Sequence, residues 1–236
     1  MSLTAIKSKL KKCADSDRAN HSQRYFKTGK GEYGEGDIFI GVAVPIVRKL
    51  SREYYKVLPI KDVTTLIKSS IHEERLLALF IIVLQFNKTQ DNSLKEKIYQ
   101  LYLRSTRYIN NWDLVDCSAG RIVGAFLIFK NKEPIYQLAK SKNLWERRVA
   151  IMSTSYFINE GKFNDTLKIA KSYLNDEHDL IHKATGWMLR EIGKRDFAVE
   201  EQFLKSHYKK MPRVMLRYAI EKFPEDQRKG YLRGEI

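Results

Sequence analysis

Apolar residues recur every three or four positions along most of the chain, which is the spacing of an amphipathic helix. The pattern predicts helices over 46–57, 61–71, 73–86, 94–108, 112–128, 134–140, 144–158, 164–174, 179–193, 198–208 and 212–223. Residues 1–22 indicate one further, more polar helix, with Leu3, Ile6 and Leu10 at helical spacing. The breaks are short and fall at residues such as Pro59, Gly161 and Pro212. An all-α fold follows.

A weak repeat underlies these helices. Ala150, Ala184 and Ala219 lie in similar apolar segments 34 and 35 residues apart, and Ala78 lies 72 residues before Ala150. Such a period is typical of helical hairpins that bury their apolar faces only against their neighbours. We therefore predict a HEAT-like helical-repeat solenoid, an α-α superhelix of about five or six repeats with a basic concave groove. It would form a single domain over 1–236, with an N-terminal helix and Gly-rich loop in 1–44 and repeats in 45–236. Solenoids of this size are commonly monomers.

Residues 29–36 contain four glycines in eight positions and are predicted to form a loop. It is either a connector or a phosphate-contacting loop, in which backbone N–H groups, Lys27 and Lys30 would meet a nucleic-acid backbone. No P-loop pattern is present, which argues against nucleotide binding there. The apolar run 38–44 indicates a buried extended segment that leads into a helix beginning at Pro45.

The 236 residues include 43 Lys and Arg against 28 Asp and Glu, a formal net charge of +15 that attracts phosphates. The two cysteines, Cys13 and Cys117, form no disulfide framework, so we expect a reducing cytoplasm, with nucleoid association in a bacterium. No signal peptide, membrane-spanning stretch or cluster of metal ligands is visible. We predict no metal, no cofactor and no membrane contact.

Within this basic chain, Trp112 and Asp116 lie one helical turn apart on the same face. A carboxylate in a phosphate-binding surface is repelled by the ligand, so its presence calls for an explanation. One explanation is that it acts on a cationic centre that rests against the flat aromatic ring. The alternatives are a solvated or arginine-paired Asp116 and a Trp112 that anchors the core. Asp113 has a simpler role, since a negative charge in the first turn suits the helix dipole.

A second tryptophan lies on a basic helix face. Ile181, Ala184 and Met188 mark the packing side of the helix of 179–193, and the other side carries Lys183, Trp187, Arg190 and Lys194. An aromatic among cations suits nucleic acid, although the indole could instead cover the aliphatic stems of those cations.

Other charged residues have simpler interpretations. Arg147 and Arg148 either bind phosphate or remain solvated, whereas Trp145 belongs to the buried face. Two charged runs, Glu73-Glu74-Arg75 and Glu225-Asp226-Gln227-Arg228, are predicted to form ion pairs on helix surfaces.

Three motifs, in this order on a helical-repeat chain, resemble the DNA alkylation repair family of AlkD-like DNA glycosylases. They are Asn111-Trp112-Asp113-Leu114-Val115-Asp116, Leu144-Trp145-Glu146-Arg147-Arg148-Val149-Ala150 and Lys183-Ala184-Thr185-Gly186-Trp187-Met188-Leu189-Arg190-Glu191. The segment Gly36–Val42, with Pro45 and Arg48, is similar to the same family's N-terminal region. The likeness spans nearly the whole chain and implies HEAT-like repeats that act on duplex DNA containing alkylated purines.

The resemblance also implies residue roles. Asp116 would be the catalytic aspartate, Trp112 and Trp187 would contact the lesion, Arg148 would hold DNA, and Tyr25 would be an N-terminal aromatic on DNA. The basic residues expected to bind DNA beside Arg148 are Lys27, Lys30, Lys183, Arg190 and Lys194. Some members carry aromatic residues where this chain has Asp179 and Leu180, which affects any lesion contact from that position.

The chemistry agrees with these roles. An alkylated purine such as 3-methyladenine or 7-methylguanine is already cationic and a good leaving group, so no general acid is needed. Asp116 would stabilise the positive sugar and position water, giving an abasic site in an uncut strand without base flipping. The alternatives are a non-catalytic HEAT-like scaffold that binds nucleic acid by charge alone and, with less support, a protein–protein adaptor.

Overall fold

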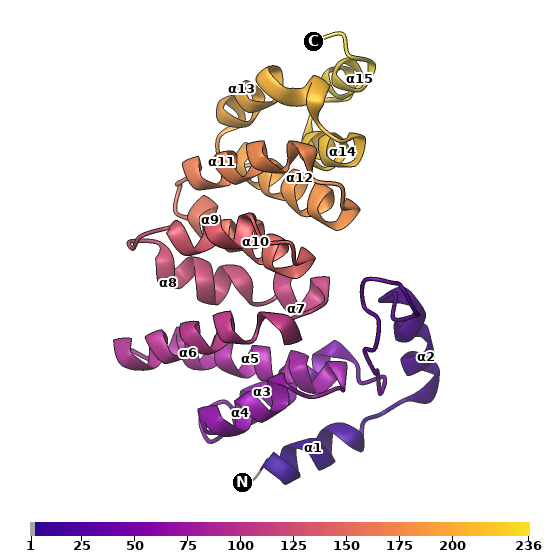
Figure 1. The fold of residues 1–236 in the computed structure, drawn as a ribbon, viewed down its shortest axis with the longest axis vertical. Coiled ribbons are helices and arrows are strands. Elements are labelled where there is room, and N and C mark those ends of the chain that lie inside the picture. The colour runs from indigo at the N-terminus through magenta and orange to yellow at the C-terminus, as the bar shows by residue number, and fades with distance from the viewer. Residues whose placement is uncertain (1–2) are drawn as a thin grey trace. The chain divides into compact units, whose positions relative to one another are not determined.

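The computed structural model describes residues 3–236, and within that range the secondary structure is helical apart from one isolated bridge between Ile38 and Ile71 (Figure 1). The predicted all-α fold is thereby confirmed. The chain divides into two compact units, one reaching Ile122 and the other comprising Val123–Ile236. In the described part of the chain, no helix is long and apolar enough to cross a membrane.

The first unit is built around α5. Its α-helices are α1 (Leu3–Lys11), α2 (Ser16–Tyr25), α3 (Val44–Tyr54), α4 (Ile60–Ile67), α5 (His72–Lys88), α6 (Asn92–Arg104) and α7 (Trp112–Asp116). Residues 76–83 of α5 are apolar and buried on every side, so this helix needs partners all round. Helices α3, α4, α6 and α7 supply them.

The second unit is a stack of helices (Figure 1, pink to yellow). Its α-helices are α8 (Ala125–Leu127), α9 (Glu133–Ala139), α10 (Leu144–Asn159), α11 (Asn164–Ser172), α12 (Asp179–Gly193), α13 (Phe197–His207), α14 (Arg213–Ala219) and α15 (Glu225–Arg233). Helix α10 packs on α9, α11 and α12, and α12 packs in turn on α13 and α14. Ala150, Ala184 and Ala219 lie on α10, α12 and α14 and are fully buried, as their spacing predicts for equivalent positions of a repeat.

Two glycines allow neighbouring repeats of this unit to approach closely. A Cβ on Gly124 would lie 2.1 Å from the Ser153 carbonyl oxygen and 2.9 Å from Tyr156 Cβ. A Cβ on Gly186 would lie 2.3 Å from the Met215 carbonyl oxygen and 2.6 Å from Tyr218 Cβ. In both cases the contacted positions are 29 and 32 residues further along, so the same backbone contact recurs in the stack.

Several helix boundaries differ from the pattern of apolar residues. In place of the single helix predicted over 1–22, the described residues from Leu3 onward form α1 and α2, because Asp15 caps α2 by accepting a hydrogen bond from the Arg18 N–H at 2.9 Å. The predicted helix 112–128 is broken into α7, a π-turn at Gly120–Gly124 and α8, since the backbone adjusts where Gly124 meets α10. Helix α15, which the pattern missed, contains the predicted Glu225–Arg228 ion pair.

Replacement of Gly186 by Ala should destabilise the protein by about 2–3 kcal/mol, because backbone of α14 occupies the space of the new methyl group. Gly29→Ala is the matched control, since its Cβ would meet only the flexible carboxylate of Glu32 at 2.9 Å. Urea unfolding of both variants measures the difference. Equal stability of the two would contradict the close approach.

Candidate functional site

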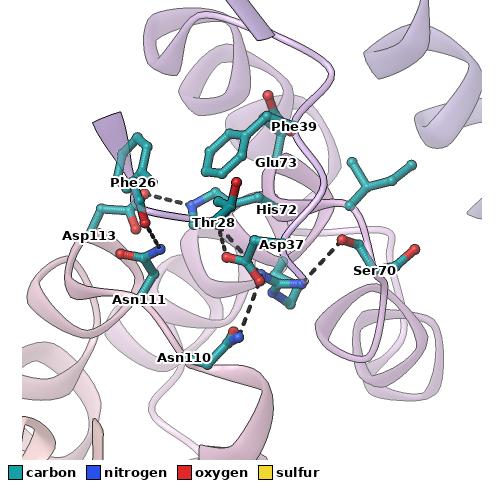
Figure 2. A network of polar contacts seen from close by, with 12 residues as sticks. Phe26, Thr28, Asp37, Phe39, Ser70, His72, Glu73, Asn110, Asn111 and Asp113 are labelled. Carbon is teal, nitrogen blue, oxygen red and sulfur yellow. Dashed lines mark hydrogen bonds and ion pairs between the residues drawn. The ribbon is translucent and has the colours of Figure 1, made fainter. Parts of the chain in front are cut away.

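The first unit contains a buried ionic network centred on His72, the first residue of α5 (Figure 2). Its Nδ1 lies 2.9 Å from Asp37 Oδ2, and its Nε2 lies 2.8 Å from Asp113 Oδ2. Asp37 comes from the end of the Gly-rich loop, and Asp113 from the first turn of α7. One imidazole therefore joins three segments that are distant in sequence.

Further donors complete the coordination of Asp37. Arg75 Nη2 donates to Asp37 Oδ1 at 2.5 Å, and Asn110 Nδ2 donates to the same oxygen at 3.1 Å. Arg75 Nη1 also donates to the carbonyl oxygen of Ser69 at 2.9 Å. Burial alone would raise the pKa of Asp37, but the hydrogen bond from His72 and the charge of Arg75 lower it.

The network keeps His72 charged. Burial alone would lower the pKa of His72, but the charge of Asp113 and the hydrogen bonds to Asp113 and Asp37 raise it to about 9. At neutral pH the ring is therefore an imidazolium that donates from both nitrogens. A neutral ring could donate from only one of them.

The residues after His72 clamp the segment that follows the Gly-rich loop. The Glu73 carboxylate accepts backbone N–H bonds from Ile40, Gly41 and Val42 at 2.7–3.2 Å. Glu74 pairs with Lys7 of α1 at 2.8 Å. Glu73, Glu74 and Arg75 are all at most 5% exposed, so the prediction of helix-surface ion pairs is wrong for these residues. The predicted extended segment does lead into a helix, which begins at Val44, one residue before Pro45.

Trp112 ends a stack of aromatic rings. The rings follow in the order Trp112, Phe26, Phe39 and His72, with neighbouring centroids 5.0, 4.9 and 4.2 Å apart and interplanar angles of 17°, 19° and 21°. Tyr25 meets Trp112 edge-on at 5.9 Å and is itself 58% exposed. Phe26 covers one face of the indole, yet Trp112 remains half-buried, so part of its surface is open to a ligand.

Helix α7 holds the proposed catalytic turn. The Asn111 side chain caps it by accepting from the Trp112 N–H at 2.9 Å, and Asp113 lies in its first turn, as predicted for the dipole. Asp116 is the last residue of the helix, one turn after Trp112, and is half-buried. Burial and the charges of Asp113 and Asp116 raise the pKa of the next residue, Cys117, well above its ordinary value.

The Gly-rich loop is a loop, as predicted, and it closes on itself. Gly34 N–H donates to the Lys27 carbonyl at 2.9 Å, and a Cβ on Gly34 would lie 2.5 Å from the Phe26 carbonyl oxygen. The Lys27 ammonium lies 3.9 Å from Glu32 Oε1, and Lys30 is exposed. DNA contact by Lys27 and Lys30 stays a prediction.

In the second unit, carboxylates accompany the cations around Trp187. The Trp187 Nε1 donates to Glu191 Oε1 at 3.1 Å, and Lys194 lies 2.6 Å from the same oxygen. Arg190 pairs with Glu221, and Lys183 pairs with Asp179 at 2.6 Å. Burial alone would raise the pKa of Glu191, but the hydrogen bonds from Lys194 and Trp187, together with the charge of Lys194, lower it. The buried side of α12 contains the apolar residues that the pattern predicts.

The two arginines of α10 also have protein partners. Arg147 Nε lies 2.7 Å from Asp176 Oδ2 and Nη1 donates to the carbonyls of Ser141 and Lys142, so this arginine is not simply solvated. Arg148 is 4% exposed and donates to the Leu180 carbonyl. Its proposed contact with DNA stays a prediction. Trp145 is buried, as expected.

The buried network of His72, Asp37 and Arg75 is not predicted by the sequence patterns described above. A usable signal existed, since a helix that is apolar all round, as α5 is over 76–83, must also bury the charges at its start. Over residues 3–236, no group of three or more His, Cys, Asp or Glu side chains could hold a metal ion.

The chain is similar to known proteins in both sequence and fold. Residues 6–223 match the family model of the DNA alkylation repair enzyme. The fold is similar to the solved structure of a predicted DNA alkylation repair enzyme from Enterococcus faecalis, with a TM-score of 0.68 and 16% identity over 90% of this chain and 97% of that chain. At this identity the structural likeness shows the fold alone. No curated protein matches the chain.

His72→Gln should lower the free energy of unfolding by about 2–3 kcal/mol at pH 6, and the difference should shrink as the pH rises through 9. Below the unfolded pKa of 6.5 the ring is protonated in both states, so its full stabilisation is present. Above 9 the folded protein loses that proton and the stabilisation with it. Urea unfolding at several pH values measures the difference.

The control for this prediction is His21→Gln, because the His21 side chain is exposed. It should show little difference from the intact protein at any of these pH values. A difference for His72→Gln that stays constant from pH 6 to 10 would contradict a charged His72.

Proposed function

Because the chain belongs to the DNA alkylation repair enzyme family, we propose that it is a monofunctional DNA glycosylase. It hydrolyses the N-glycosidic bond of cationic alkylated purines, such as 3-methyladenine and 7-methylguanine, in duplex DNA. The products are the free base and an abasic site in an uncut strand. The proposal rests mainly on one observation, the half-buried Asp116 one turn after Trp112 on α7.

The setting of this turn supports a catalytic role. The Asn111 cap and the ion pair of Asp113 with His72 fix the start of α7, and the stack on Phe26 fixes Trp112. A carboxylate held this way needs little reorganisation when positive charge develops near it, and such preorganisation lowers a barrier. The +15 net charge supplies general attraction for DNA.

The proposed reaction uses few groups. The C1′–N bond breaks, the bonding electrons leave with the cationic base, and the base departs neutral. The Asp116 carboxylate stabilises the positive charge that develops on the sugar and orients the water that attacks C1′. The proton lost by the water passes through Asp116 to solvent. No lysine forms a Schiff base in this scheme, so the strand stays intact.

Other residues are proposed to bind the DNA. Trp112 would contact the lesion nucleotide through its open surface, and the exposed Tyr25 ring lies beside it for a further contact. The family resemblance adds Trp187 and Arg148. Lys183, Arg190 and Lys194 would have to exchange their carboxylate partners for phosphates or share them, which weakens the contribution proposed for each.

The second candidate is a helical-repeat scaffold that binds nucleic acid without catalysis. The net charge of +15 serves a scaffold as well as an enzyme, and the protein partners of Arg147 and Arg148 give these arginines a structural role in either case. The two candidates differ at Asp116. A scaffold should bind DNA as well or better without this negative charge, whereas an enzyme should lose turnover.

Asp116→Asn should slow release of 7-methylguanine from duplex DNA by about 100-fold or more while DNA binding is retained. The measurement is single-turnover base release and abasic-site formation, with binding followed in parallel. Asp91→Asn is the matched control, since Asp91 is an exposed N-cap of α6 and Asn caps a helix equally well. Tight binding with no base release by the intact protein would favour the scaffold.

A further inference from the structure

A basic cavity lies in the first unit beside the ionic network. It has a volume of about 430 Å³, and its walls come from α4, α6 and the 3-10 turn Thr106–Tyr108. Four of the nine lining residues are cationic, and none is acidic; the four are Lys68, Lys97, Arg104 and Arg107. All four are exposed. The volume lies within the range of about 300–1,000 Å³ found for ligand pockets.

Helix dipoles explain only part of this charge. Arg104 is the last residue of α6, and Lys68 is the C-cap of α4, positions where a cation is favoured without any ligand. Lys97 lies in the second turn of α6, and Arg107 lies beyond the end of that helix. Arg107 does lie in the last turn of the 3-10 helix, where a cation is also favoured, but Lys97 gains nothing from a dipole. The presence of Lys97 and the convergence of all four cations on one cavity need another explanation.

The uncharged lining of the cavity suits a ligand that also has an apolar part. Ile60, Leu101 and the Tyr108 ring line the cavity together with the hydroxyl-bearing residues Thr64 and Ser105. Arg107 stacks over Tyr108 at 4.6 Å, and its Nη2 donates to the Tyr108 hydroxyl at 2.6 Å. A lining that combines cations with apolar and aromatic side chains matches a phosphodiester with its sugar, since the cations would bind the phosphate and the apolar side chains would contact the sugar.

The cavity shares its connecting loops with the His72 network. Lys68 leads into Ser69 and Ser70, whose carbonyl oxygens lie 2.9 and 3.4 Å from Arg75 Nη1. The turn with Arg107 and Tyr108 leads into Asn110, which donates to Asp37. One wall of the cavity is therefore continuous in sequence with the segment that precedes Trp112.

We propose that this cavity is a second phosphate-binding site, which takes the sugar–phosphate backbone of the duplex at a distance from the lesion. The site rests on the proposed action on DNA and extends the footprint beyond the residues of α7. Its role is binding, and it contributes nothing to the chemical step.

The test compares the DNA affinity of a variant that lacks three cations of the cavity with that of a variant that lacks three cations elsewhere. The triple variant Lys97→Ala/Arg104→Ala/Arg107→Ala should bind a long lesion duplex about 10- to 100-fold more weakly at moderate salt. The slope of log K against log[salt] should fall by about 2–3, near 0.9 per lost phosphate contact. The rate of base release at saturating DNA should not change.

The matched control is Lys56→Ala/Lys61→Ala/Lys88→Ala. These three lysines are also exposed and belong to the same unit, but none of them lines the basic cavity; Lys56 and Lys88 line a neighbouring cavity that shares only Ile60 with it. A smaller loss and a smaller change of slope in this control support the site. Equal losses in the two triple variants, or no loss in either, would overturn it.

Two further arms identify the ligand and separate this site from the proposed function. In the first, a duplex shortened to the bases around the lesion should bind the intact and the variant protein with equal affinity. In the second, tight binding of pyrophosphate to the cavity, with unchanged DNA affinity of the variant, would overturn a DNA site. If the intact protein releases no base but the cavity variant still loses DNA affinity, the glycosylase proposal fails and the binding site stands.

Discussion

A single imidazolium between two carboxylates holds the first unit in its shape. Asp37, His72 and Asp113 come from a loop, the start of α5 and the start of α7, so the two ion pairs join three elements that are distant in sequence. Buried charges are costly unless they are paired, and here Arg75 and Asn110 both donate to the second carboxylate oxygen of Asp37. The position of α7, and with it Trp112 and Asp116, depends on a network whose residues belong to other elements.

The aromatic stack and the ionic network stabilise each other. His72 is a member of both, because the ring that bridges the carboxylates also packs flat against Phe39. The stack then passes through Phe26 to Trp112, so the indole and the aspartate are held from two directions. The Gly-rich loop makes this possible, since its glycines let the chain turn tightly between Phe26 and Asp37.

Local sequence spacing predicted most of the helices but little of the network. Apolar periodicity reports which face of a segment is buried, and it located α5, α10 and α12 and the alanines of the repeat. Pairs such as His72 with Asp113, 41 residues apart, leave no local trace. The interruption of the helix of 112–128 was hidden for a similar reason, because it depends on how closely Gly124 approaches another helix.

The sequence also did not predict which charged side chains pair with one another. The spacing Trp112 to Asp116 is a property of one helix turn and could be recognised directly. The cations beside Trp187 were expected to be open to DNA, yet the partners Glu191 and Glu221 come from the next turn and from a later element. Tertiary contacts decide which cations remain free to bind DNA, and a helical projection of one segment carries no information on those contacts.

The charge around α7 also decides the fate of its neighbouring thiol. Only the thiolate form of a cysteine attacks an electrophile at an appreciable rate, and burial with two adjacent carboxylates keeps Cys117 protonated. A methyl group on DNA therefore has no competent acceptor in this side chain, although it follows Asp116 directly. The same environment makes this cysteine a poor target for methylating reagents.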